Sequence, residues 1–318
     1  MGLGKIGMGY DLHLPIEGFV HSHARALCLH PSFELSCAVD PDNARRQMFE
    51  NTYHVPAYST ISEALSNHVV DFGVIATPTE MHLQGLQELL GSAAPKAILC
   101  EKPLSSKVND SRRMISECKK RNVQLYVNYM RRSEPGAIEV KRRIDSAQII
   151  GPIKGVVWYS KGFLHNGSHF VNLLEYWLGD VIRFDVASYG VNLSDFDASP
   201  DVHIIFEKGS VFFLSTQESN LNNHSVELIA ANGRLRYEDS GRSIEWRTVS
   251  LDAGTQFEQR LSNSTEVIDS DLSRYQLHVL DNIALCLSGG EGRFCSGGQG
   301  LQTHEYVSRI LEARYGPQ

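Results

Sequence analysis

The stretch Ala97-Ile98-Leu99-Cys100-Glu101-Lys102-Pro103 places a charged tripeptide directly after an apolar run with the length of a buried β-strand. The polar residues Ser105-Ser106-Lys107 follow, where a helix can begin. Open α/β sheets bind their ligands at the carboxyl ends of their strands, and Lys102 lies at such an end. A nearby carboxylate or a bound ligand can tune the charge of this lysine, and Pro103 restricts the turn that orients it. Because a surface turn could carry the same tripeptide, its meaning depends on the rest of the chain.

The residues around this stretch alternate between strand-like and helix-like segments. Strands are predicted over 33–39, 69–76, 97–100 and 123–127, and helices over 17–29, 44–50, 61–66, 81–90 and 110–121. Such alternation predicts parallel strands joined by right-handed crossovers. Residues 1–132 are therefore expected to form a doubly wound α/β domain.

The pattern changes after about residue 132. A helix over 135–146 precedes closely spaced strands at 153–159, 184–189, 202–206, 210–214, 225–230 and 234–237. Glu207-Lys208-Gly209 and Ala231-Asn232-Gly233 are typical of hairpin turns. Residues 133–318 are therefore expected to form an α+β domain with a mostly antiparallel open sheet. Its closing helices, 273–287 and 303–313, could pack back on the first domain.

The composition is that of an ordinary two-domain globular protein. The chain has 318 residues and a formal net charge of −7, which give no reason to expect nucleic-acid or membrane partners. No apolar run approaches the length of a membrane span, and no signal peptide is visible. The six cysteines lack metal-ligand spacing, so reduced thiols in a cytoplasmic protein are predicted.

The chain begins with a candidate nucleotide-binding loop. Gly2-Leu3-Gly4-Lys5-Ile6-Gly7 fits G-x-G-x-x-G, in which glycines let a pyrophosphate approach backbone N–H groups. The motif requires a strand before it and a helix after it. Only Met1 precedes Gly2, so we expect a truncated first strand; the alternative is that another segment fills its place. The helix is delayed, because residues 8–15 intervene.

Asp40 follows the predicted strand 33–39. At this position a carboxylate can accept a hydrogen bond from a ribose 2′-hydroxyl, which favours NAD over NADP. Arg45 and Arg46 lie close enough in sequence to weaken that preference. The alternative interpretation of Asp40 is a turn and helix N-cap residue.

Together these motifs resemble the Gfo/Idh/MocA family of oxidoreductases. The matching residues, in order, are Gly2-x-Gly4-x-x-Gly7, Asp40-Pro41-Asp42, Ala76-Thr77-Pro78-Thr79-x-x-His82, Glu101-Lys102-Pro103-Leu104, Asn128-Tyr129-x-Arg131-Arg132 and Gly167-Ser168-His169. The resemblance implies a Rossmann domain and an antiparallel-sheet domain often used to form homodimers or homotetramers. It also implies NAD(P)-dependent redox chemistry on sugars or polyols.

The resemblance also implies roles for single residues. Lys102 would contact the substrate hydroxyl and the nicotinamide ribose, and His169 would be the acid/base. An imidazole titrates near neutral pH, and an ammonium group stabilises a developing alkoxide. The remaining candidates are Thr77, Pro78, His82 and Glu101 on the cofactor side, and Asn128 and Arg132 on the substrate side. For His169 alone, a structural histidine at a helix start is the alternative.

Two positions depart from the family pattern. His165 stands where many members have an aspartate, and Asn172 where another acid is often found. His165 can hydrogen-bond a substrate hydroxyl, so it joins the catalytic and substrate-binding candidates, but it lacks a permanent charge. The i, i+4 spacing of His165 and His169 would suit a metal pair. No acidic third ligand is evident, so no metal is predicted.

The sequence therefore predicts an oxidoreductase that transfers hydride between NAD, or NADP, and a sugar, polyol or nucleotide-linked sugar. Two alternatives stay open. One keeps the fold and cofactor but uses transient oxidation for elimination or glycoside cleavage. The other is a nucleotide-binding regulatory protein without turnover.

Overall fold

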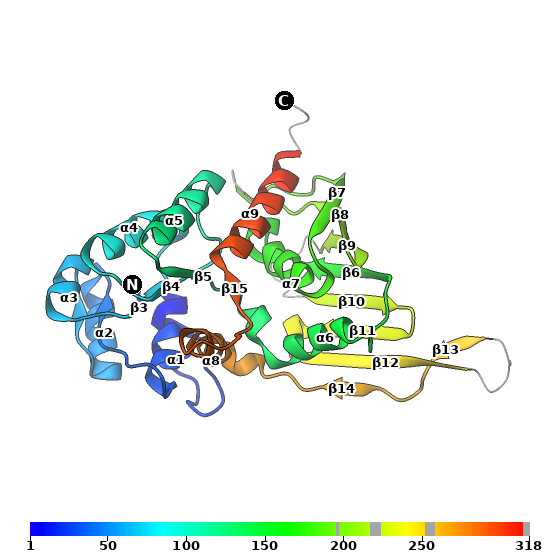
Figure 1. Ribbon diagram of the computed structural model, residues 1–318, viewed down its shortest axis with the longest axis horizontal. Coiled ribbons are helices and arrows are strands. Elements are labelled where there is room, and N and C mark those ends of the chain that lie inside the picture. Colours follow the sequence, from blue (N-terminus) through cyan, green and yellow to red (C-terminus); the bar gives the residue numbers. More distant parts are fainter. Residues whose placement is uncertain (195–196, 217–223, 252–257, 314–318) are drawn as a thin grey trace. The chain divides into compact units, whose positions relative to one another are not determined.

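The computed structural model describes residues 1–194, 197–216, 224–251 and 258–313. It contains two compact units (Figure 1). Unit 1 comprises Met1–Ser133 and Ser273–Gln302; unit 2 comprises Glu134–Leu272 and the residues from Thr303 onward. The second domain expected over 133–318 is thus interrupted, since residues 273–302 belong to unit 1.

Unit 1 is built on short parallel strands. Strands β3 (Phe72–Ile75), β4 (Ala97–Cys100) and β5 (Gln124–Val127) pair in parallel, and β15 (Cys295–Ser296) adds an antiparallel edge to β5. Strands β1 (Ala38–Val39) and β2 (Ala57–Tyr58) form a separate parallel pair.

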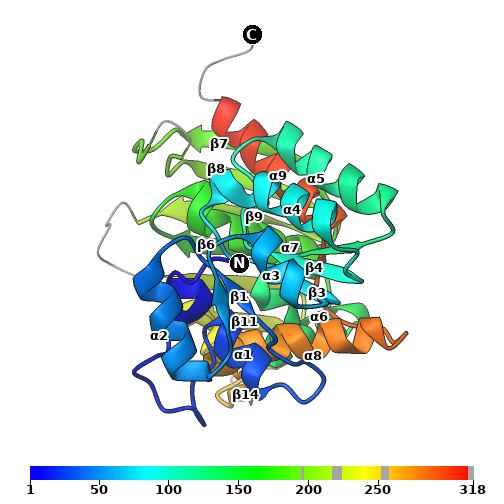
Figure 2. The ribbon, with the colours of Figure 1, turned by 90° about the vertical axis from the view of Figure 1, so that its left-hand side faces the viewer.

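Helices cover both faces of this sheet. Figure 2 shows α4 (His82–Ser92) and α5 (Val108–Lys120) on one side of β3 and β4, with α1 (His23–Leu29) and α8 (Tyr275–Leu287) on the other. Ile98 packs with the α4 and α5 side chains, whereas its neighbour Leu99 packs with Val279 and Ile283 of α8. Successive strand residues point to opposite faces, which is why β4 is one continuous apolar run. The predicted doubly wound Rossmann fold is confirmed.

Polar caps explain where several helices of unit 1 begin. Ser22 accepts a hydrogen bond from the Arg25 N–H at the start of α1. Asp42 caps α2 (Asn43–Tyr53), and Thr60 caps α3 (Ile61–Asn67). These side chains satisfy N–H groups that lack an intrahelical acceptor.

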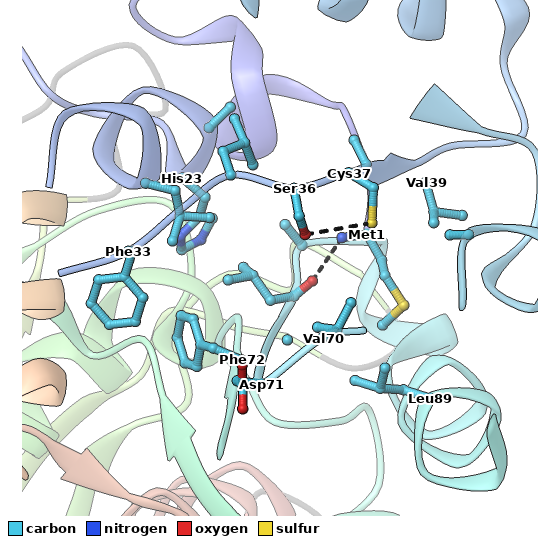
Figure 3. A pocket seen from close by; sticks show the side chains of 18 of the residues that line it. Met1, His23, Phe33, Ser36, Cys37, Val39, Val70, Asp71, Phe72 and Leu89 are labelled. Carbon is cyan, nitrogen blue, oxygen red and sulfur yellow. Dashed lines mark hydrogen bonds between the residues drawn. The ribbon is translucent and has the colours of Figure 1, made fainter. Parts of the chain in front are cut away.

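Two strands are shorter than the sequence predicts. The expected strands 33–39 and 69–76 are regular only over Ala38–Val39 and Phe72–Ile75. Between them, the main chain of Met1 hydrogen-bonds Val74 O (2.7 Å) and Ala76 N (2.8 Å), and Gly2 N donates to Val39 O (2.8 Å). Met1 and Gly2 thus occupy the carboxyl end of the place expected for the first strand. Regular strand structure requires ladder hydrogen bonds, and residues 33–37 border a cavity (Figure 3).

Unit 2 contains, in its described residues, a nine-stranded sheet in the order β13-β12-β11-β10-β6-β9-β8-β7, with β14 beside β12. The strands are β6 (Ile153–Tyr159), β7 (Val181–Ser188), β8 (Asp201–Phe206), β9 (Gly209–Ser215), β10 (Ser225–Ala230), β11 (Gly233–Glu238), β12 (Ser243–Leu251), β13 (Gln259–Leu261) and β14 (Glu266–Ile268). All neighbours pair antiparallel except β6 and β9, which are parallel. The predicted sheet-rich second domain is confirmed.

Helices α6 (Pro135–Asp145) and α7 (Ser168–Leu178) contribute their apolar side chains to the core of unit 2. Trp177 of α7 is fully buried, and its indole N–H donates to the carbonyl of Ala137 (2.9 Å). Trp158, Phe212 and Ile229 of the sheet are instead exposed. The last helix, α9 (Gly297–Glu312), begins in unit 1 and ends in unit 2. Among the helices described, none combines the length and hydrophobicity of a membrane span.

For a chain with a free amine at Met1, the free energy of unfolding should rise between pH 6 and pH 8. Burial lowers the pKa of the Met1 ammonium from 8.0 to about 6. The unfolded chain therefore binds more protons in this window, so raising the pH favours the folded state. The shift corresponds to about 2.7 kcal/mol. Urea unfolding at pH 6 and pH 8 measures the difference.

An N-acetylated chain is the control, because it has no terminal amine to titrate. Burial also lowers the pKa of His304 to about 4. In both chains, this histidine therefore makes stability increase with pH over a lower pH range. The same pH dependence between pH 6 and pH 8 with and without acetylation would contradict the prediction.

Candidate active site

The glycine motif forms a tight turn at the carboxyl edge of the unit 1 sheet. Gly2 has φ +87°, and a Cβ atom there would lie 2.5 Å from the Ala76 carbonyl oxygen. A Cβ atom at Gly7 would lie 2.0 Å from the Gly2 carbonyl oxygen, so larger residues are excluded at both positions. Lys5–Gly9 then form a π-helical turn. The first N–H groups of such a turn lack intrahelical acceptors and are available to a phosphate.

Asp40 supports this turn from the end of β1. Its carboxylate is buried and accepts hydrogen bonds from Leu3 N (2.7 Å) and Asp42 N (2.9 Å). Arg45 lies 3.7 Å from the same carboxylate. Asp42, not Asp40, caps the helix that follows. Asp40 thus connects the glycine loop to β1, and its contact with a ribose stays a prediction.

Glu101 is the centre of a buried hydrogen-bond cluster after β4. Its Oε1 atom lies 2.7 Å from His23 Nε2 and accepts a hydrogen bond from Asn128 Nδ2 (2.6 Å), and its Oε2 atom accepts one from Lys102 N (3.3 Å). Burial by itself raises the pKa of Glu101, but the contacts with His23, Asn128 and Lys102 outweigh it and leave the pKa below its usual value. The ionised carboxylate therefore joins the start of α1 to the ends of β4 and β5.

Among the buried polar atoms without a hydrogen-bond partner in the described residues, two are oxygen atoms at this edge of the sheet. They are Thr77 Oγ1, after β3, and Asn128 Oδ1, after β5. Buried polar atoms are normally paired, so an orphaned pair suggests a missing ligand. An N–H group of a nicotinamide carboxamide could donate a hydrogen bond to an oxygen atom of this kind. The residues present therefore fit the cofactor that the sequence predicts.

Other predicted residues lie around the same edge. The buried ring of His82 has one nitrogen 3.2 Å from Leu104 O and the other 2.9 Å from Thr77 O, so it connects the loops after β4 and β3. Pro78 follows Thr77, and Arg132 is buried in the turn Met130–Ser133 after β5. Lys102 is half-buried. Their predicted contacts with cofactor or substrate remain predictions.

His165 and His169 lie in unit 2. His165 is exposed on the π-helical turn Phe163–Gly167, and His169 is half-buried in the first turn of α7. The backbone N–H groups of Leu164 and His165 donate to the two carboxylate oxygens of Asp197, at 2.8 and 3.0 Å. Asp197 thus holds the turn that presents His165. Burial raises the pKa of this carboxyl group, although the backbone N–H groups oppose the rise.

Asn172, the second departure from the family pattern, has a structural role. Its side chain is buried and donates to Thr303 Oγ1 (2.8 Å), and that hydroxyl donates in turn to Glu175. The amide therefore connects α7 to α9. The contacts of His23 and Asp197 were not predicted, because these residues are far in sequence from the groups they hold and belong to no recognised motif.

Comparisons with known proteins find relatives of this chain among oxidoreductases. Residues 4–129 match the family model GFO_IDH_MocA, described as an oxidoreductase family with an NAD-binding Rossmann fold. The chain is 30% identical to scyllo-inositol 2-dehydrogenase (NAD(+)) of Bacillus subtilis over 203 residues, 59% of this chain and 52% of that protein. It is 24% identical to D-xylose 1-dehydrogenase (NADP(+)) of Haloarcula marismortui over 83% of this chain and 78% of that one. The chain thus spans about half the length of the first relative.

Solved structures have the same fold. The WlbA dehydrogenase from Bordetella pertussis, in complex with NADH and UDP-GlcNAcA, superposes with a TM-score of 0.70 at 20% identity, covering 91% of this chain and 92% of that one. An oxidoreductase from Agrobacterium radiobacter, in complex with NAD+, L-tartaric acid and magnesium, gives 0.72 at 16% identity, covering 93% of each chain.

Replacing His23 by alanine should destabilise the protein by about 3 kcal/mol, because it leaves the buried Glu101 carboxylate with one partner fewer. His23→Gln, which can still donate a hydrogen bond, should cost less. His13→Ala, at an exposed position, is the control. Urea unfolding measures all three. Equal stabilities of His23→Ala and His13→Ala would contradict a supporting role for His23.

Proposed function

Residues 4–129 match the GFO_IDH_MocA oxidoreductase family, and we propose that the chain belongs to this family and transfers hydride between a nicotinamide cofactor and a carbon of a sugar, polyol or nucleotide-linked sugar. The observation that carries the proposal is the edge of the unit 1 sheet. There Lys102 follows the buried Glu101 cluster, and Thr77 and Asn128 offer unpaired polar atoms. The named dehydrogenases among the relatives support the same class of reaction.

Unit 1 would hold the cofactor. The turn from Gly2 to Gly7, with Lys5 and Ile6 between the glycines, would bind the pyrophosphate through backbone N–H groups. Thr77, Pro78 and Asn128 would lie beside the nicotinamide. Asp40 favours NAD, but Arg45 lies against its carboxylate and Arg46 donates to the carbonyl oxygen of Asp40 (2.8 Å). These cations would accept a 2′-phosphate, so NADP is the alternative.

The catalytic groups would be Lys102 and His169. When bound, the cofactor accepts or donates the hydride. In the oxidation direction, His169 would take the proton from the substrate hydroxyl as hydride leaves the carbon, and the ammonium of Lys102 would stabilise the developing negative charge on oxygen. Arg132 and His165 would contact the other hydroxyl groups of the substrate. Where many family members have an aspartate, this chain has His165, whose side chain can donate as well as accept a hydrogen bond.

The chain would also assemble into a homodimer or homotetramer. The strands of unit 2 expose Trp158, Phe212 and Ile229, each more than two-fifths exposed. Exposed apolar patches of this kind are typical of protein interfaces. Sedimentation measurements on the full chain would establish the oligomeric state.

A second candidate, nucleotide binding without turnover, is favoured by one observation. The side chain at position 165 has no permanent charge, and the acidic group at this turn, Asp197, instead accepts two backbone N–H groups. Fluorescence titration with NADH and NADPH, followed by a screen of sugars and polyols, distinguishes the candidates. Binding followed by turnover supports the dehydrogenase, binding alone supports the second candidate, and no binding contradicts both.

Lys102→Met and His169→Gln should each lower kcat by about 100-fold or more, because each removes a group that acts on the reacting oxygen. Their affinity for NADH should change little. Lys107→Met, at an exposed position five residues after Lys102, is the matched control. Steady-state kinetics on the substrate that the screen identifies measures the effect. Unchanged kcat in both variants would exclude the proposed roles.

Thr77→Val should weaken NADH binding about fivefold without loss of stability. The variant removes a hydroxyl whose pairing we assign to the cofactor, and one hydrogen bond contributes about 1 kcal/mol. The free protein loses no hydrogen bond in the described residues, since Thr77 Oγ1 has no partner there. Thr248→Val repeats the chemical change at an exposed position of unit 2. Unchanged affinity of Thr77→Val would argue against a cofactor contact.

A further inference from the structure

His224, the residue before β10 in unit 2, lies in a buried polar cluster that the proposed mechanism does not use. Its Nε2 atom lies 3.1 Å from Ser160 Oγ and 3.4 Å from Asn166 Nδ2, and its Nδ1 atom lies 3.2 Å from Ser240 Oγ. Ser160 precedes the turn Phe163–Gly167, and Asn166 belongs to it. One buried ring therefore connects this turn to the segment that follows β11.

The neighbours of His224 assign the tautomer of its ring. The Nδ2 atom of Asn166 donates a hydrogen bond to the carbonyl oxygen of Ser160 (3.0 Å), which identifies it as the amide nitrogen. An amide N–H group only donates, so the Nε2 atom of His224 accepts from it and carries no proton. In the neutral ring the proton is then on Nδ1, which donates to Ser240 Oγ.

The Nδ1 side of the ring is held by a strained turn. Asp239 and Ser240 have φ +47° and +61°, and Gly241 has φ +108°. Residues other than glycine rarely adopt this left-handed region, and two in succession persist only where other contacts hold them. Ser240 N donates to the main-chain oxygen of His224 (2.8 Å), and the Ser240 hydroxyl accepts from Nδ1. These contacts fix the rotation of the imidazole ring and direct Nε2 toward Asn166.

The turn that His224 contacts leads directly into α7, the helix that carries His169. Phe170, in the first turn of α7, packs against the imidazole of His224, with ring centroids 5.7 Å apart. In sequence, His169 lies between Asn166 and Phe170, so residues on both sides of it contact the same ring. A change in the position of this ring would therefore displace His169.

We propose that His224 is a positioning residue for His169, because its neutral imidazole holds the turn Phe163–Gly167 through Asn166. This inference rests on the proposed function, in which His169 is the acid/base. Asp197 holds the main chain of the same turn at the two residues before Asn166. A displacement of about 1 Å can cost about 100-fold in rate, so a small movement of the turn is enough to matter.

Two substitutions of His224 separate the roles of its two nitrogen atoms. In His224→Gln, the side-chain oxygen can reach the place of Nε2 and accept from Asn166. In His224→Asn, the shorter amide can replace only Nδ1, as the donor to Ser240. Hydrogen exchange at the Gly167 amide, which closes the turn by donating to Gly162 O (3.0 Å), measures the order of the turn without a substrate. Exchange should be about tenfold faster in His224→Asn than in His224→Gln.

Kinetics on the substrate that the screen identifies tests the link to hydride transfer. His224→Asn should lower kcat about tenfold relative to His224→Gln, because only the glutamine keeps the acceptor for Asn166. NADH affinity should be unchanged in both variants, since the cofactor would bind in unit 1. Urea unfolding measures the stability of each variant. A merely structural role for His224 would change stability without separating the two kcat values, and that result would overturn the proposal.

A double-mutant cycle tests whether His224 acts through Asn166. Asn166→Ala removes the amide that Nε2 contacts, so adding His224→Asn should change Gly167 exchange and kcat little further. Full additivity of the two substitutions would overturn the proposal. If His224→Asn does not fold, Asn166→Ala decides alone, because Asn166 is only half-buried and unchanged exchange and kcat in this variant would overturn the proposal.

The two measurements also distinguish this inference from the proposed function. If exchange separates His224→Gln from His224→Asn but the unsubstituted chain turns over no substrate, the proposed function fails, while the result supports the contact of His224 with the turn. Equal Gly167 exchange in the two variants would overturn the inference even if the unsubstituted chain is an active dehydrogenase.

Discussion

The candidate site depends on the hydrogen bonds of one buried group, the carboxylate of Glu101. It contacts His23 at the start of α1 and Asn128 at the end of β5, residues that are 78 and 27 positions away in sequence. An ionised group is kept in the interior only where charged or hydrogen-bonding partners compensate for lost hydration. The hydrogen bonds of Glu101 therefore fix the start of α1, the end of β4 and the end of β5 relative to one another. Lys102 is the next residue along the chain, so these contacts also fix its position.

A second constraint acts at the other half of the same sheet. Asp40 accepts from the backbone of Leu3, and Gly2 pairs with Val39, so the glycine turn is tied to β1. Met1 ties the same turn to β3. These contacts hold the turn at the carboxyl edge of the sheet even though β1 and β3 are separated by a cavity along most of their length. The position of the glycine turn thus does not require that β1 and β3 be joined by a continuous sheet.

The parts of the site that could be predicted are those with local signatures. The glycine motif and the Glu101-Lys102-Pro103 turn were identified because steric and chain-direction rules act over a few residues. The support given by His23 to Glu101 and by Asp197 to the His165 turn was missed, because long-range hydrogen bonds leave no periodic pattern. Asn172 was identified as a departure from the family, but its contact with Thr303 followed only from the packing of α7 against α9.

The sequence by itself indicated the fold class, the alternation of strands and helices in the first domain, the two hairpin turns and the resemblance to the Gfo/Idh/MocA family, but it did not predict α7 or β12. The features that it indicated follow from apolar periodicity, glycine and proline positions, and motif order, which neighbouring residues carry. Only the tertiary structure decided that the expected strand 33–39 is regular over just Ala38–Val39, that residues 273–302 belong to unit 1, and that Asp40 supports the glycine turn. The physical reason is that ladder hydrogen bonds, buried charges and cavities depend on segments distant in sequence, which only the folded chain brings together.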